Sequence, residues 1–206
     1  MGAEVSGRAF LGIVKYVKST RGPATLSTVV AAGNSETQAA FERPIRVMSW
    51  YPYPTFVGFL HGLERVLGRA GQHSFCRELG DVAGVRDLGT VLRVYRTLSS
   101  PERLIRACDK VWLSYYRNAG RMEAVTWAPE DTTLRIYDFP EMDPSHCRLM
   151  EGWMISTMRS IGFYVNNDAF ERKCMSTGDP YHEFFCTWQK RTTKRSSGRM
   201  KAGQSK

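Results

Sequence analysis

The stretch FERKCMSTGDPYHEFFCTW, residues 170–188, has two apolar runs on either side of a connection rich in Gly, Asp and Pro. This pattern predicts a β-hairpin with residues 176–180 as its connection. In that register Cys174 and His182 lie opposite each other. Because successive side chains of a strand point to opposite faces, Glu171, Lys173 and Glu183 are expected on the outer face. The buried face is expected to hold Phe170, Cys174, His182, Phe184, Cys186 and Trp188.

The segments upstream of this hairpin complete the predicted fold. Residues 121–127 and 132–137 have the pattern of two strands joined by a short turn. Between the hairpins, residues 144–161 predict a helix, with Cys147 on its apolar face. Helical patterns also cover 8–19, 24–32, 35–41, 55–67, 74–98 and 101–118, and an aromatic turn is expected at 50–54. The sequence therefore predicts an α+β domain, in which a four-stranded, mostly antiparallel sheet of two hairpins packs against N-terminal helices and one intervening helix.

Length and charge predict one globular domain followed by a tail. The 206 residues are 42% hydrophobic, enough for a single core over residues 1–188. Of the net charge of +9, the segment 189–206 carries +7 and has no acidic residue, so the body carries only +2. Because this segment is low in apolar residues, we expect a disordered basic tail. Its cations include Lys190, Arg191, Lys194, Arg195, Arg199 and Lys201.

Several classes of protein are excluded by what the sequence lacks. The sequence contains no run of about twenty apolar residues, so no membrane span is predicted. No secretory signal is recognisable, and five cysteines, an odd number, favour reduced thiols, so a cytoplasmic protein is expected. Nucleophile-elbow, phosphate-loop, dinucleotide and His-Glu-x2-His motifs are all missing, and the carboxylates are scattered. We therefore expect no enzymatic activity.

The hairpin motif Cys174-x3-Gly178-Asp179-x2-His182-x-Phe184, preceded by a helix with Cys147, resembles the end of the 4-vinyl reductase domain. That family has a cysteine where this chain has histidine. Over residues 5–188 the chain also resembles an uncharacterised paralogous family abundant in myxobacteria, through Ser49-Trp-Tyr-Pro52, Ser100-Pro-Glu102, Trp112-x2-Tyr-Tyr116 and Gly178-Asp-Pro-Tyr181. Relatives of the 4-vinyl reductase domain include small-molecule sensor modules, some with zinc. The resemblance implies a ligand-binding or scaffolding domain, but little about its chemistry.

A metal site and a ligand pocket are the two candidate sites. Zinc prefers four thiolate, imidazole or carboxylate ligands, and Cys147, Cys174 and His182 offer three, with Glu171 or His146 as a fourth. Strict alternation turns Glu171 away from this group. The alternative to a metal site is that the cysteines are buried thiols, which act as small apolar groups, and that the histidine is hydrogen-bonded. We therefore expect no cofactor, with zinc as the one ion considered.

The pocket is predicted between sheet and helices, with walls of Met150, Met154, Met158, Phe170, Phe184 and Trp188.

Haem is a further cofactor against which the sequence can be compared. Haem and nitric oxide binding domains also begin with helices and use a helical histidine, and His61 lies in a predicted helix. Their Tyr-x-Ser-x-Arg motif is absent, however, and Tyr115-Tyr-Arg117 does not match it. Haem is therefore not expected.

These observations predict a non-enzymatic sensory or scaffolding domain, with a homodimer expected. Its partner would be a small hydrophobic ligand or another protein. The alternative is a nucleic-acid-associated protein that uses the basic tail for phosphate contacts.

Overall fold

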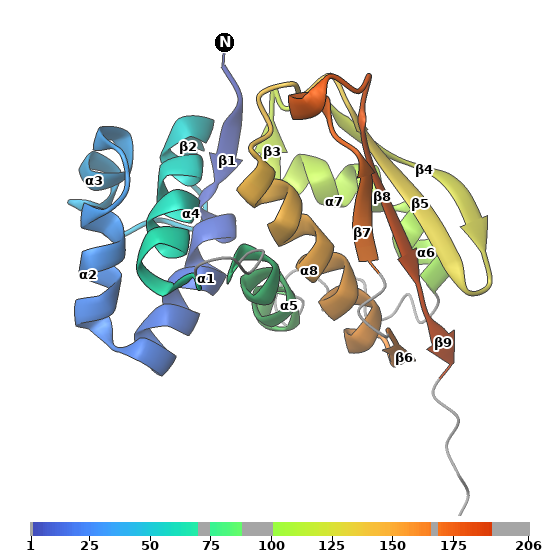
Figure 1. Ribbon diagram of the computed structural model, residues 1–206, viewed down its shortest axis with the longest axis horizontal. Helices are drawn as coiled ribbons and strands as arrows, with labels where there is room; N and C mark the ends of the chain where they lie inside the picture. Colours follow the sequence, from blue (N-terminus) through green and yellow to red (C-terminus); the bar gives the residue numbers. More distant parts are fainter. Residues whose placement is uncertain (1, 70–74, 88–100, 166–168, 191–206) are drawn as a thin grey trace, which may run out of the picture.

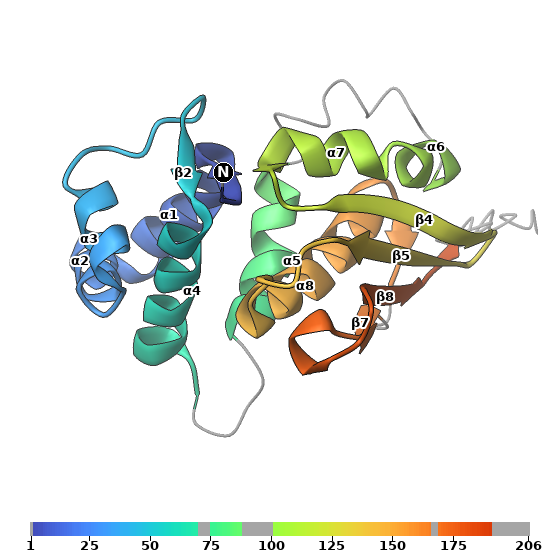
Figure 2. The same cartoon turned by 90° about the horizontal axis from the view of Figure 1, so that it is seen from above.

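The computed structural model describes residues 2–69, 75–87, 101–165 and 169–190. Figures 1 and 2 show a helical N-terminal half beside a C-terminal half in which helices pack on one side of a sheet. The N-terminal helices are α1 (Gly7–Arg21), α2 (Pro23–Ala31), α3 (Ser35–Phe41) and α4 (Tyr53–Leu67). The helix α5 (Phe75–Asp87) follows and packs against the C-terminal half. Within the described ranges, no helix is long and apolar enough to cross a membrane.

The C-terminal half contains the predicted sheet, and the predicted fold class is confirmed. Two helices, α6 (Pro101–Arg106) and α7 (Cys108–Tyr115), precede β4 (Arg121–Ala128) and β5 (Asp131–Tyr137). The helix α8 (Pro144–Ser160) separates this hairpin from β7 (Ala169–Lys173) and β8 (His182–Thr187), which are joined through a short 3-10 turn. The strand order is β4-β5-β8-β7, and all three pairings are antiparallel. A further short pair, β6 (Phe163–Tyr164) with β9 (Gln189–Lys190), ends the described chain.

A second small sheet, not predicted from the sequence, joins the two halves. The strand β1 (Glu4–Ser6) pairs with β2 (Trp50–Pro52) on one side and with β3 (Tyr116–Arg117) on the other. The segment expected to be an aromatic turn is thus partly a strand, because β1 supplies its hydrogen-bond partners. The same pairing ends the helix expected over 101–118, since Tyr116 adopts extended backbone opposite Val5. Of the helix expected over 74–98, residue 74 and residues 88–98 lie outside the described residues.

The helices α5 and α8 cross at their glycines. A Cβ atom on Gly152 would lie 1.9 Å from the carbonyl oxygen of Arg77, and one on Gly80 would lie 2.1 Å from that of Leu149. Only glycine permits such a close backbone approach. The crossing fixes α8 between α5 and the sheet, and so positions the side chains that α8 presents to the β7–β8 hairpin (Figure 1).

Candidate metal centre

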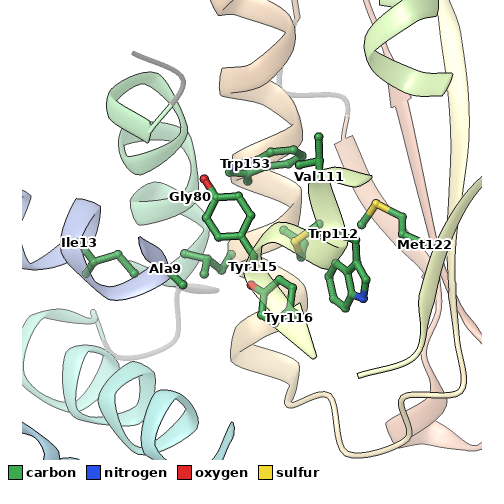
Figure 3. Close-up of a pocket in the computed structure, with 11 residues that line it drawn as sticks. Ala9, Ile13, Gly80, Val111, Trp112, Tyr115, Tyr116, Met122 and Trp153 are labelled. Atoms are coloured by element: carbon green, nitrogen blue, oxygen red, sulfur yellow. The ribbon is translucent and has the colours of Figure 1, made fainter. Parts of the chain in front are cut away.

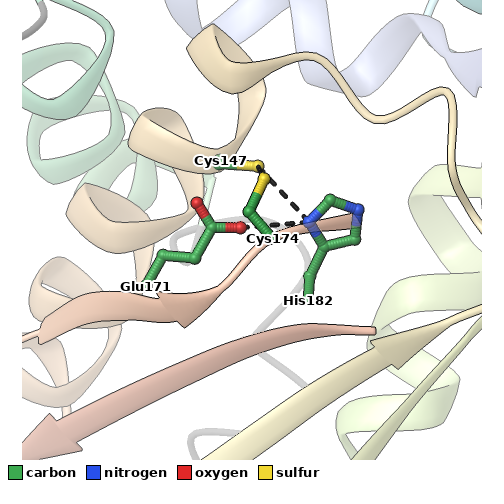
Figure 4. A group of neighbouring side chains, drawn as sticks. All are labelled: Cys147, Glu171, Cys174 and His182. Atoms are coloured by element: carbon green, nitrogen blue, oxygen red, sulfur yellow. Dashed lines mark hydrogen bonds and ion pairs between the residues drawn. The ribbon is translucent and has the colours of Figure 1, made fainter. Parts of the chain in front are cut away.

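Four side chains from α8 and the β7–β8 hairpin converge on one point, as Figure 4 shows. Cys147 lies in the first turn of α8, where Asp143 caps the helix by accepting a hydrogen bond from the Ser145 N–H at 2.8 Å. Glu171 comes from β7, Cys174 directly follows that strand, and His182 begins β8. One potential ligand atom from each of Cys147, Glu171, Cys174 and His182 lies within 4.8 Å of all the others.

The separations between these atoms suit a tetrahedral ion. The Sγ atoms of Cys147 and Cys174 are 4.0 Å apart, and Cys147 Sγ is 3.6 Å from His182 Nδ1. His182 Nδ1 is 3.0 Å from Glu171 Oε1. Zinc bonds of about 2.0 to 2.3 Å place two tetrahedral ligand atoms roughly 3.3 to 3.8 Å apart. Small side-chain movements would therefore bring all four atoms to bonding distance of a common ion.

The predicted face of Glu171 is wrong, and a β-bulge is the reason. The register between β7 and β8 shifts between Glu171 and Lys173, so that Glu171 pairs with Phe184 while Lys173 pairs with Glu183. An extra residue in one strand interrupts strict alternation. As a result Glu171 shares the inner face with Cys174 and His182. The prediction for Phe170 fails too, because this side chain is 44% exposed and packs against Phe185 on the outer face.

His182 presents its Nδ1 atom to a carboxylate. Its Nε2 atom lies 3.2 Å from the carbonyl oxygen of Phe139, which only accepts, so Nε2 carries a hydrogen. In a neutral ring Nδ1 is then an acceptor, yet it faces the Glu171 carboxylate at 3.0 Å. Either a proton or a metal ion between the two groups removes this conflict. A histidine that donates its second N–H to a backbone carbonyl is also the usual arrangement of a metal ligand.

A second layer of polar groups holds the candidate ligands in place. Arg148 donates from Nη2 to Glu171 Oε2 at 2.8 Å and also contacts Glu151. The buried Glu151 accepts the Glu171 backbone N–H at 2.8 Å, which ties β7 to α8. On the other side, the Cys174 N–H donates to Asp179 Oδ2 at 2.9 Å. Gly178 permits this tight turn, since its φ of 99° is unfavourable for other residues.

Within the cluster, the pKa of the acid Glu171 and the pKa of the Cys147 thiol shift in opposite directions. Burial alone would raise the pKa of Glu171, but hydrogen bonds with His182, Cys147 and Cys174 outweigh burial and hold that pKa below its usual range. Burial and the Glu171 charge raise the pKa of the Cys147 thiol far above its usual value. In the metal-free protein Cys147 is therefore a neutral thiol. A bound divalent ion would reverse this, because its charge deprotonates a coordinating thiol.

His146, considered as a fourth ligand, belongs to a separate buried network. Its Nδ1 atom is 3.0 Å from the Tyr53 hydroxyl and its Nε2 atom is 2.8 Å from the Tyr116 hydroxyl. Burial lowers the pKa of His146 to about 3, so the ring is neutral. With both nitrogens engaged, His146 cannot reach the cluster that its sequence neighbour Cys147 enters. Helical geometry explains the difference, since adjacent residues point about 100° apart.

Apart from the exposed Phe170, the residues predicted to wall one pocket are distributed over the core. Met150 borders a cavity of about 50 Å³ between α1, α5, α7 and α8, shown in Figure 3. Met154 and Met158 border another of about 40 Å³ on the inner face of the sheet. Phe184 is fully buried, and Trp188 stacks on Trp127 and donates to the Pro129 carbonyl at 3.0 Å. Cavities of this size hold about one or two water molecules and are too small for an organic ligand.

A larger groove lies in the N-terminal half, where none was predicted. It has a volume of about 580 Å³ and lies between α1, α2 and the segment after α3. Leu26 and Phe41 are part of its apolar lining, and Lys18 and Arg43 lie on it as well. This volume falls within the usual range for small-molecule sites.

The predicted tail lies mostly outside the described residues. Lys190 is the last residue of β9, and its backbone pairs with Phe163. Arg191, Lys194, Arg195, Arg199 and Lys201 are outside the described part. The nucleic-acid contacts of the tail and the homodimer stay predictions.

The fold is that of H-NOX proteins. The chain superimposes with a TM-score of 0.63 on the Fe(II) unliganded H-NOX protein from K. algicida, at 10% identity over 91% of this chain and 98% of that one. For the S. oneidensis H-NOX protein in the Fe(II)NO state the TM-score is 0.63, at 12% identity over 89% and 99%. For the IWP-051-bound H-NOX from Shewanella woodyi in the Fe(II)CO state it is 0.60, at 14% identity over 92% and 97%. No family model and no curated protein matches the sequence.

These comparisons correct two expectations. The resemblance to the 4-vinyl reductase domain and to a myxobacterial family is wrong, since the structural neighbours are H-NOX domains. The resemblance to these families depended on short motifs, most of them near one hairpin, whereas the structural match to H-NOX proteins extends over both halves of the chain. The expectation of no cofactor is also overturned, because H-NOX domains bind haem and the neighbours are Fe(II) proteins.

The described residues nevertheless do not fit a haem group. Haem needs a space of several hundred cubic ångströms, and the cavity between α1, α5, α7 and α8 measures only about 50 Å³. The groove of about 580 Å³ is large enough, but the residues that line it include no His, Cys, Met or Tyr to bind the iron. The ring nitrogens of His146 and His182 are engaged by buried partners, and His61 bonds Asp143 Oδ2 at 3.0 Å. The remaining histidine of the sequence, His73, lies outside the described residues. The cluster in Figure 4 is thus the described site best suited to a metal.

Proposed function

We propose that the protein is a non-enzymatic sensory domain that senses a divalent metal ion bound through thiolates, with zinc as the expected ion. The ligands are Cys147, Cys174, His182 and Glu171. The convergence of these four ligand atoms within 4.8 Å of one another is the observation that carries the proposal. Two thiols and an imidazole form a donor set that favours zinc over magnesium or calcium.

The position of the cluster supports a sensory role. Cys147 lies at the start of α8, while the other three ligands lie on the β7–β8 hairpin. The same helix crosses α5 in the tight contact at Gly152. Metal binding would therefore fasten the hairpin to the helix that connects the sheet with α5. Loss of the ion, or oxidation of a thiol, would release that connection.

The composition of the site also supports a role without catalysis. Catalytic zinc sites keep one coordination position open for water or substrate, whereas structural sites use four protein ligands. Here four protein side chains are available, and Cys147 and His182 are fully buried. A closed site of this kind holds structure together and offers no position for a substrate.

Metal analysis of full-length protein purified without a metal-affinity tag tests the proposal. We expect close to one equivalent of zinc. Substitution by Co²⁺ should give the visible absorption of a tetrahedral thiolate complex. His182→Ala and Cys174→Ser should each weaken metal binding at least tenfold, while Cys108→Ser, which alters a buried thiol outside the cluster, should not. Less than about a tenth of an equivalent, with no uptake on adding Zn²⁺, would refute the site.

The ligand role of Glu171 has its own test. Glu171→Gln keeps the shape of the side chain but removes the charge. If Glu171 binds the ion, the variant should lose metal affinity and the Co²⁺ spectrum should change, because a neutral amide replaces a charged carboxylate ligand. If only its hydrogen bond with His182 matters, the spectrum should stay that of the native protein.

A second candidate function, binding of a small apolar molecule, is supported by the groove of about 580 Å³. The test uses a dye that fluoresces in apolar sites, such as anilinonaphthalene sulfonate. Val14→Glu, which places a charge in the groove, should abolish the fluorescence, whereas Lys15→Glu on the neighbouring exposed position should not. Equal fluorescence in both variants would exclude the groove as the site.

A further inference from the structure

The face of the four-stranded sheet that points away from the helices is a surface of alternating cations and aromatic rings. The helices α6, α7 and α8 pack on the inner face, where Leu134 and Cys186 meet Met154 across a cavity. In Figure 2 no drawn helix covers the opposite side of β4, β5, β8 and β7. Phe170, the most exposed large apolar residue of this face, is 44% accessible. We call this side the outer sheet face.

A cationic side chain lies over each aromatic ring on the outer sheet face. Arg172 lies 3.6 Å from the centroid of the Phe185 ring and 5.4 Å from that of Phe170. Towards the other end, Arg135 and Lys173 lie over Tyr181 at 4.2 and 4.9 Å. Arg121 lies over Tyr137 at 4.2 Å, and the Tyr137 and Tyr181 rings meet edge to face at 5.5 Å. The rings and cations therefore extend across all four strands.

The charge of this face is positive. Four cations, Arg121, Arg135, Arg172 and Lys173, face three acids. Glu123 pairs with Arg121 and Glu183 pairs with Arg135, while Asp131 lies at the far end of β5, opposite Thr187. Arg172 and Lys173 have no carboxylate within ion-pair distance among the described residues. The chain then leaves the sheet through β9, and residues 191–206 add six cations and no acid to the sequence. Most of the net charge of +9 thus lies on this side or in the segment that continues from it.

We propose that the outer sheet face binds single-stranded nucleic acid. A single strand supplies both kinds of group that this face accepts: phosphates for the cations, and flat bases for rings and guanidinium planes. An arginine that lies on a ring keeps its outer plane free for a base and its N–H groups free for phosphate. An acidic protein would supply negative charge but no flat bases. A duplex hides the flat faces of its bases, so it too would supply only negative charge to this face.

This proposal is independent of the metal centre, because Arg172 and Phe170 lie on the opposite face from His182 and Cys147. A protein without bound metal that still binds the strand would leave the present proposal intact. Loss of strand binding in the outer-face variants should not change the metal content. The two proposals therefore fail separately.

Fluorescence anisotropy of full-length protein with a labelled oligothymidylate of twenty nucleotides tests the proposal. Base stacking predicts that Phe170→Ala and Arg172→Ala each weaken binding by roughly tenfold. Both side chains are exposed, so the fold should be retained, and circular dichroism checks this. Matched controls elsewhere on the surface are Leu113→Ala for the apolar side chain and Arg21→Ala for the cation; neither should change the affinity. Duplex DNA of the same length should bind more weakly.

Four results would overturn the proposal. The first is no binding of the oligonucleotide at low salt. The second is binding that Phe170→Ala and Arg172→Ala leave unchanged while neutralisation of the cations in 191–206 abolishes it, which would assign binding to that segment alone. The third is equal affinity for single strand and duplex. The fourth is competition by polyglutamate as strong as by unlabelled oligothymidylate, which would indicate an acidic protein partner.

Discussion

Substitution of Gly152 by alanine should destabilise the protein, although alanine favours helix. The new Cβ atom would lie 1.9 Å from the Arg77 carbonyl oxygen and 2.6 Å from the Asp81 nitrogen. Contacts of a Cβ atom below 3.0 Å essentially do not occur, and both of these neighbours are backbone atoms of α5. The two helices must therefore separate by about 1 Å or more, since no side chain can move aside instead.

The magnitude follows from two opposing effects. Overpacking of this kind costs about 1 to 3 kcal/mol, and a gap of 0.5 to 1 Å forfeits about a quarter to a half of the dispersion energy of the contacts it opens. Replacing glycine in a helix interior returns about 1 kcal/mol. The dispersion loss over the long α5–α8 contact offsets this gain, so we expect a net loss of about 1 to 3 kcal/mol in the free energy of unfolding. Because Cys147 lies on the same helix, metal affinity should fall as well.

Urea unfolding followed by far-ultraviolet circular dichroism measures this loss. Gly80→Ala, which introduces a Cβ atom 2.1 Å from the Leu149 carbonyl oxygen, should behave in the same way. Gly2→Ala is the matched control, because nothing lies within 4 Å of its new Cβ atom. A Gly152→Ala protein as stable as the native one, or more stable, would mean that α5 and α8 do not cross in backbone contact.

Three further predictions concern the buried polar groups and the thiols. Tyr116→Phe removes the hydroxyl that lies 2.8 Å from His146 Nε2, and leaving that buried nitrogen without this partner should cost about 1 to 3 kcal/mol in urea unfolding; an unchanged midpoint would contradict the network. Burial, with the Asp109 charge, raises the pKa of the Cys108 thiol from 9.0 to about 11. The unfolded chain loses that proton first, so stability should fall as pH rises from about 9 to 11, and Cys108→Ala should make the fall shallower in pH-dependent unfolding. Of the five cysteines, all within the described residues, only Cys174 is not buried. A thiol reagent should therefore modify it first, as peptide mapping would show, and added Zn²⁺ should slow the reaction; equal labelling with and without zinc would count against the metal centre.

Local sequence patterns were sufficient for most of the secondary structure. Helices α1, α4 and α8 and both hairpins of the sheet follow from apolar periodicity and from turn residues, which act over a few neighbouring positions. The same local reasoning placed Cys147, Cys174 and His182 together as candidate ligands. By contrast, β1, β2 and β3 escaped prediction, because each is only two or three residues long and forms through partners more than forty residues away.

The sequence by itself determined an α+β domain with two antiparallel hairpins, a basic C-terminal segment and three metal-type ligands near one another. Only the tertiary structure decided that Glu171 completes the group, that Phe170 and Arg172 face outwards, and that His146 belongs to a separate network. The bulge in β7 accounts for the first two, since a single extra residue reverses the face of every side chain on one side of it. Packing accounts for the third. Tyr53 and Tyr116 come from distant parts of the chain, and no spacing in the sequence records that they meet on the two sides of one imidazole ring.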